Sequence, residues 1–201
     1  DLPEDFKTFE LCLSAVSQCG FALSYIPDQF RTYEIFYAAL KSGAAILSYI
    51  PEEVKSRELY LDAVKIYGRN LRDVPYEFRD REICLAAVKS IGGALADVPD
   101  ALRDQEICMT AVRQAGDAIA HVPSGVLSLK LWSIAIQSEP MVLSLLSENL
   151  KTRETCLSAV KKSGWALEYV PYELRDKELC LAALKSRGSV LSFVPEDLRD
   201  D

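Results

Sequence analysis

Six cysteines are the residues to consider first for metal binding or redox chemistry. Five of them lie at multiples of 24 residues from one another: Cys12, Cys84, Cys108, Cys156 and Cys180, with Cys19 apart. No pair of C-x-x-C motifs suggests zinc, and equivalent positions on helices packed about 8–10 Å apart are too distant for a disulfide. A free cysteine is also a small hydrophobic side chain. We therefore expect buried thiols, no metal, and an intracellular, reducing compartment.

His121 is the one histidine, so any Ser–His or Cys–His catalysis would depend on it alone. Its equivalents elsewhere in the sequence are Tyr, Asp, Leu or Phe, which is typical of a variable surface position. No phosphate-binding loop, nucleophile elbow or H-E-x-x-H motif occurs. The acidic residues recur in register and cap helices. We expect no catalytic residue, no cofactor and no enzymatic activity.

A proline recurs every 24 residues without a slip in spacing. These prolines are Pro3, Pro27, Pro51, Pro75, Pro99, Pro123, Pro171 and Pro195. Ser147 occupies the one position of this period that is not proline. Such self-similarity is typical of a solenoid, whose units bury their apolar faces only by stacking. The sequence predicts one domain over residues 1–201, with full units starting at 3, 27, 51, 75, 99, 123, 147 and 171 and a partial ninth at 195–201.

Positions within a unit are numbered here from its proline, and the unit 75–98, PYEFRDREICLAAVKSIGGALADV, shows the pattern. Position 6 is Thr, Ser or Asp, a helix N-cap whose side-chain oxygen accepts from amides of the first turn. Glu at position 8 and Lys or Arg at position 15 suit the two ends of a helix dipole. Gly at position 18 predicts a C-terminal cap with left-handed backbone.

Each unit therefore contains one α-helix of about 11 residues, followed by a short element that is either α-helical or 3-10. Apolar positions 9, 10, 11, 13 and 14 cover about 200° of the helix, as a helix packed between two copies requires. Position 13 is alanine in every unit, so we expect neighbouring helices to approach most closely there. The fold class is all-α, an α-solenoid.

The composition is 49% hydrophobic and 26% charged, which is ordinary for a folded soluble protein. The net charge of −7 disfavours nucleic acid as a partner, because phosphate binding needs a basic face. No apolar run of about 18 residues is present, so we expect no transmembrane segment.

The sixth unit, PSGVLSLKLWSIAIQSEPMVLSLL at 123–146, departs most from the pattern. Positions 5, 7 and 12 should face solvent, so Leu127, Leu129 and Ile134 there predict an exposed apolar patch for a protein partner. At the variable position 19, Met141 and Trp165 fall in adjacent units and extend it. The alternative is local repacking that buries these residues against the seventh unit. Trp132 replaces the core cysteine and should fill the core.

Aromatic residues gather in the first third of the chain. Phe36 and Tyr60 lie in the core row, where packing explains them. Tyr25 and Tyr49 occupy a variable position, and we consider them as further contact residues for a partner.

The pattern A-V-K-x-x-G-x-A-L-x-x-V-P-x-E-L-R resembles a family of domains of unknown function, clearest at 82–104 and 154–176 and poorest in the sixth unit. Such domains occur in effectors of intracellular bacteria and in multi-repeat proteins of protists and algae. The resemblance implies a helical repeat scaffold and no particular activity. The unit length is also similar to that of leucine-rich repeat variant proteins, which alternate α- and 3-10 helices.

These observations favour a non-catalytic scaffold for protein partners or a structural subunit of a larger assembly. Two alternatives remain: a targeting module of a larger effector whose activity lies elsewhere, and a solenoid that binds a small ligand or pigment. Both ends cut through a unit, and terminal repeats normally carry polar caps. We expect the chain to continue, or neighbouring subunits to cover its ends.

Overall fold

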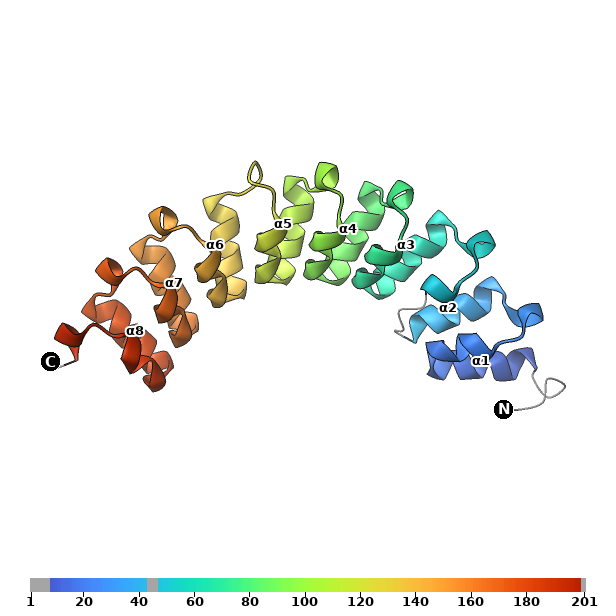
Figure 1. The fold of residues 1–201 in the computed structure, drawn as a ribbon, viewed down its shortest axis with the longest axis horizontal. Helices are drawn as coiled ribbons and strands as arrows, with labels where there is room; N and C mark the ends of the chain where they lie inside the picture. The colour runs from blue at the N-terminus through green and yellow to red at the C-terminus, as the bar shows by residue number, and fades with distance from the viewer. Residues whose placement is uncertain (1–7, 43–46, 200–201) are drawn as a thin grey trace. The chain divides into compact units, whose positions relative to one another are not determined.

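The computed structural model describes residues 8–42 and 47–199, and in these ranges it contains α-helices and 3-10 helices but no strand. The α-helices are α1 (Phe9–Gln18), α2 (Tyr33–Lys41), α3 (Arg57–Ile66), α4 (Arg81–Ser90), α5 (Gln105–Gln114), α6 (Leu129–Ser138), α7 (Arg153–Lys162) and α8 (Lys177–Ser186) (Figure 1). The chain divides into two compact parts, residues 1–102 and 103–201, and each is considered separately. The fold is the all-α repeat solenoid that the proline period predicts.

The second element of the repeat, left open by the sequence, is 3-10 helical, and in most of the described repeats it is a pair of 3-10 helices; after η10 a turn at 124–126 takes the place of the second one. The longer ones are η2 (Gly20–Tyr25), η6 (Gly68–Asp73), η8 (Gly92–Asp97), η10 (Gly116–His121), η11 (Pro140–Leu145), η13 (Gly164–Tyr169) and η15 (Gly188–Phe193). The three-residue ones are η3 (Asp28–Phe30), η4 (Leu47–Tyr49), η5 (Glu52–Val54), η7 (Tyr76–Phe78), η9 (Asp100–Leu102), η12 (Glu148–Leu150), η14 (Tyr172–Leu174) and η16 (Glu196–Leu198).

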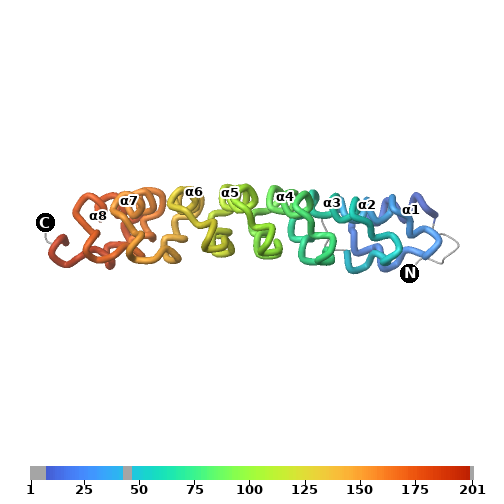
Figure 2. The backbone as a smooth tube through the Cα atoms, turned by 90° about the horizontal axis from the view of Figure 1, so that it is seen from above, coloured from blue at the N-terminus to red at the C-terminus, as the bar shows by residue number. Residues whose placement is uncertain are grey.

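Within each part, like elements stack on like. In the first part α3 packs on α4 and η6 on η8, and in the second α7 packs on α8 and η13 on η15. Figure 2 shows the α-helices of each part gathered toward one edge. The apolar residues at positions 9, 10, 13 and 14 form the core between them, as in α4, where Ile83, Cys84, Ala87 and Val88 are all buried. Position 11 is only half covered: Leu85 is half-buried and Leu181 is 46% exposed.

The predicted N-caps are confirmed in most repeats. The side chain at position 6 accepts a hydrogen bond from the amide three residues later, for example Asp80 from Ile83 at 3.0 Å and Asp176 from Leu179 at 2.8 Å. Thr32 is an exception, because it makes no such bond. The helix start is therefore fixed by a local signal that the sequence shows directly.

The prediction of a left-handed backbone at the position-18 glycine is wrong. The C-cap is the preceding residue, which is extended, as Ala115 is at φ −143° and ψ 109°, and the glycine opens the 3-10 helix. A Cβ on Gly116 would lie 2.5 Å from the carbonyl oxygen of Ala135, and one on Gly164 would lie 2.5 Å from that of Ala183. At these two junctions the glycine leaves room for the next repeat's α-helix backbone at the position-13 alanine, whereas Pro140 opens the 3-10 helix of the sixth repeat.

The expectation that position 5 faces solvent is also wrong. Arg79 lies along the repeat and donates to three backbone carbonyls, those of Val74 at 2.8 Å, Asp97 at 2.9 Å and Arg72 at 3.0 Å. Arg175 makes the equivalent three bonds in the second part. A guanidinium with its planar set of donors suits this role, and it ties together the ends of two successive 3-10 helices.

Candidate functional site

The cysteine row lies in the core, as predicted. Cys12, Cys84, Cys108, Cys156 and Cys180 are buried, Cys19 is exposed, and none is in a disulfide. Burial raises the pKa of the Cys84 and Cys108 thiols to about 11, so they stay protonated at neutral pH. A protonated thiol is a poor nucleophile and a poor metal ligand. In the part of the chain that the structure describes, no cluster of His, Cys, Asp or Glu could hold a metal ion.

His121 is exposed at the end of η10, where its backbone carbonyl accepts a bond from Arg103 at 3.1 Å. The side chain is not part of any described metal-ligating group. Across residues 8–42 and 47–199, no helix is long and apolar enough to cross a membrane.

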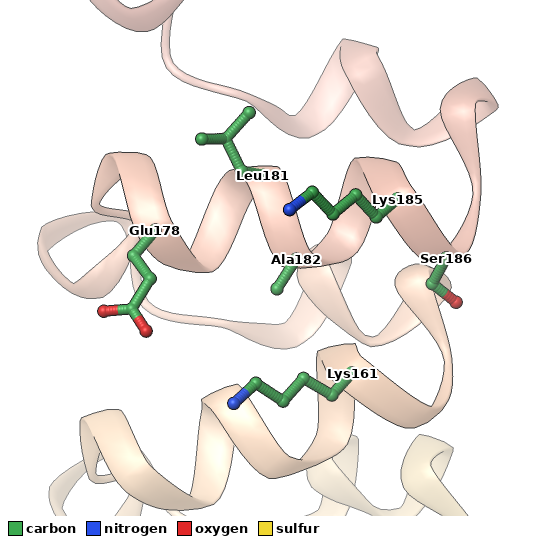
Figure 3. Close-up of a pocket in the computed structure, with 6 residues that line it drawn as sticks. All are labelled: Lys161, Glu178, Leu181, Ala182, Lys185 and Ser186. Carbon is green, nitrogen blue, oxygen red and sulfur yellow. The ribbon is translucent and has the colours of Figure 1, made fainter.

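A similar groove lies between neighbouring α-helices in each part of the chain. Between α7 and α8 its volume is about 490 Å³, and Lys161 of α7 extends along it beside Ala182 while Glu178 lies near the start of α8 (Figure 3). The equivalent groove between α3 and α4 measures about 410 Å³ and has the same residue types at the same repeat positions. The half-exposed leucine of position 11 lines both grooves, with lysine at position 15 and glutamate at position 8.

Arginine at position 7 bridges neighbouring helices at the start of these two grooves. Arg57 of α3 donates to Asp80 at 2.7 Å and to Glu82 at 2.5 Å, both on the α4 side. Arg153 of α7 makes the same pair of bonds to Asp176 and Glu178 of α8. The bond from Arg153 is the largest cause that holds the pKa of Asp176 below its usual value, and the two carboxylates raise the pKa of Arg153.

The junction between α6 and α7 differs from these two. Leu129 replaces the arginine at position 7, and Ser133 and Gln137 replace the leucine and lysine at positions 11 and 15. A cleft of about 380 Å³ lies there, lined by Leu129, Ser133, Ile136, Gln137, Thr152, Glu154, Thr155 and Ser158. Thr155 occupies position 9, which is a buried Ile or Leu in the neighbouring helices α4, α5, α6 and α8. Most residues that line this cleft are therefore polar, and Leu129 and Ile136 are its apolar members.

The residues proposed from the sequence have unequal exposures. Leu129 is 62% exposed, whereas Leu127, Ile134 and Met141 are half-buried, so the predicted continuous apolar patch is reduced to Leu129 and its cleft. The reason is that position 5 lies along the repeat and position 12 lies on the side of the preceding helix, as Ala182 of α8 does beside Lys161 of α7. Trp132 is buried, as predicted.

The aromatic candidates lie on 3-10 helices. Trp165 is 38% exposed, and its ring contacts Phe193 and the guanidinium of Arg187, 5.5 Å from the ring centroid. Its helix η13 packs on η11, which carries Met141. Tyr25 is 69% exposed, and Tyr49, 51% exposed, packs edge-on against Phe21. Neither tyrosine belongs to the α6–α7 cleft.

Sequence reasoning missed Ser133, Gln137, Glu154 and Thr155 as residues of a site. The signal was available, because Ser133, Gln137 and Thr155 each break a row of the repeat. Glu154 obeys the repeat, and only the loss of its facing arginine makes it unusual.

A family model described as Domain of unknown function (DUF4116) matches the chain four times, at residues 8–55, 56–103, 80–125 and 152–199. The chain belongs to this family. The DUF4116 matches leave out residues 126–151, which contain Leu129 and the whole of α6. The α6 side of the altered cleft therefore lies where the family model does not match, whereas its α7 side lies within the match at 152–199. No curated protein and no solved structure matched the chain.

Proposed function

We propose that this DUF4116 protein is a non-catalytic scaffold that binds a protein partner at the α6–α7 cleft. The observation that carries the proposal is Leu129, a large apolar side chain that is 62% exposed beside a cleft where the repeat rules fail. Exposed apolar surface bordered by polar groups is typical of protein-interaction sites. The repeat scaffold supplies the rigid helices α6 and α7 that hold the cleft open.

The absence of catalysis is part of the proposal. Its support is that five of the six cysteines are buried, and that the Cys84 and Cys108 thiols have raised pKa values and each donate to a backbone carbonyl. Thiols kept free in this way also favour a reducing compartment.

Affinity capture with a matched pair of variants tests the proposal. Leu129→Lys places a positive charge at the cleft, and Leu191→Lys makes the same change at a 50% exposed leucine of the last repeat. We expect the wild type and Leu191→Lys to recover the same partners from a lysate of the source cells, and Leu129→Lys to lose them. Equal recovery by all three proteins would remove this cleft as the binding site.

A further inference from the structure

The protein itself shows which group fits at the start of an inter-helix groove. Arg57 and Arg153 each place a guanidinium between two neighbouring helices, where it contacts the N-cap aspartate and the position-8 glutamate of the next helix at 2.5–2.7 Å. A guanidinium is planar and can donate to two carboxylates at once, which a lysine ammonium does less well.

At the α6–α7 junction the glutamate remains, a threonine replaces the N-cap aspartate, and the arginine is absent. Glu154 lies at position 8 of α7 and Thr152 at its N-cap, and the facing residue of α6 is Leu129. In the described structure no ion pair reaches Glu154, and Lys130, one residue along α6 from Leu129, makes none with it. Glu154 is therefore a carboxylate in an arginine-binding position without its arginine.

Other junctions without a position-7 arginine are filled or lack the acid. Tyr33 occupies the place in α2, and its hydroxyl contacts Asp62 at 3.5 Å. Phe9 of α1 carries a large ring that packs against Phe30. Gln105 of α5 faces Lys130, which is not an acid. Leu129 is shorter than a ring, and Ser133 beside it is small, so the cleft stays open.

We propose that the α6–α7 cleft binds an arginine side chain of a partner protein. The guanidinium would pair with Glu154 and donate to the hydroxyl of Thr152, and its aliphatic stem would lie on Leu129. The partner's arginine thus takes the place that Arg57 and Arg153 take within the chain. This inference rests on the proposed function and adds the chemistry of the partner.

The test uses the folded chain and a small probe, N-acetyl-arginine amide, followed by amide chemical shifts in a heteronuclear NMR titration. We expect shifts centred on residues of the cleft, such as Leu129, Ser133 and Thr155, with half-saturation at millimolar probe. The uncharged isostere N-acetyl-citrulline amide should produce none of them. Raising the salt concentration should weaken the arginine shifts, because the glutamate is exposed.

Three variants sharpen the test. Glu154→Gln and Leu129→Arg should each abolish the shifts, the first by removing the acceptor and the second by filling the site from within. Glu178→Gln is the matched control, since Glu178 already pairs with Arg153, and it should bind the probe as the wild type does. Equal shifts from citrulline, or retained binding by Glu154→Gln, would overturn the arginine proposal.

The two proposals fail in different ways. If arginine amide does not bind while Leu129→Lys loses the captured partners, the cleft is an interaction site of other chemistry and the arginine inference is wrong. If arginine amide binds as expected while Leu129→Lys keeps its partners, the arginine pocket stands and the scaffold's main interface lies elsewhere.

Discussion

At the scale of single residues, two side chains have functions that depend on the neighbouring repeat. The position-18 glycine makes room for a backbone carbonyl, and the position-5 arginine binds three of them. Both were misassigned from the sequence, one to a left-handed cap and the other to the solvent face. Both contacts involve backbone atoms of a neighbouring element, and the residue types of one repeat do not show which backbone atoms will lie beside them. The sequence alone therefore could not reveal either contact.

The glycine contact predicts a strong asymmetry between two equivalent substitutions. Gly116→Ala should lower the free energy of unfolding by about 1–3 kcal/mol, because the added methyl group overlaps the Ala135 carbonyl and the Glu139 backbone. Gly188→Ala should change it by less than about 0.5 kcal/mol, since no atom lies within 4 Å of the new Cβ. Urea unfolding followed by circular dichroism measures both, and equal losses would contradict the contact.

At the scale of elements, the junction between two α-helices is the unit that varies. The helix starts and the core rows could be predicted, because N-cap and apolar residues are local and repeat in register. The cleft could not be placed from the sequence. The cleft depends on which residues of α7 lie opposite Leu129. The exposed fractions of Leu127 and Ile134 depend on how the surrounding elements of the repeat pack against them.

The missing bridge at α6–α7 can be restored within the chain. Leu129→Arg should raise the free energy of unfolding by about 0.5 kcal/mol, because the new guanidinium would pair with Glu154 as Arg153 pairs with Glu178. Thermal unfolding is the measurement, with Leu129→Gln as a polar variant without charge.

A double-mutant cycle tests whether the stabilisation by Leu129→Arg comes from pairing with Glu154. The gain from Leu129→Arg should vanish in a Glu154→Gln background, because the guanidinium then has no carboxylate to pair with. A gain that persists in this background would mean that the arginine acts through some other contact.

At the scale of the whole molecule, the core rows run through both parts of the chain. Burial raises the pKa of the thiols of Cys84, Cys108, Cys156 and Cys180, so these four repeats each hold a neutral thiol in the core. The period and the apolar core rows followed from the sequence, because they recur from repeat to repeat. The site did not, because it belongs to one repeat.

These thiols predict how stability changes in alkaline solution. The unfolded chain loses its thiol protons near pH 9, whereas Cys84 and Cys108 in the folded chain keep theirs until about pH 11. The unfolded state therefore binds fewer protons in this window, and the free energy of unfolding should fall as pH rises through it. A Cys84→Ala/Cys108→Ala variant should show a smaller fall in urea titrations at pH 8 to 11; an unchanged slope would contradict the assignment.

The contact between the glycine and the next repeat's carbonyl has a consequence for how the array tolerates change. At Gly68, Gly116 and Gly164 the main chain lies close to the main chain of the next repeat, so the backbone itself sets the spacing at these junctions. The residue at position 10 ranges from Cys84 and Cys108 to Tyr60 and Trp132, yet all four are buried. Where backbone atoms set the distance between repeats, core side chains of very different volume can replace one another without changing that distance. The side chains around the replaced residue then adjust to the difference in volume.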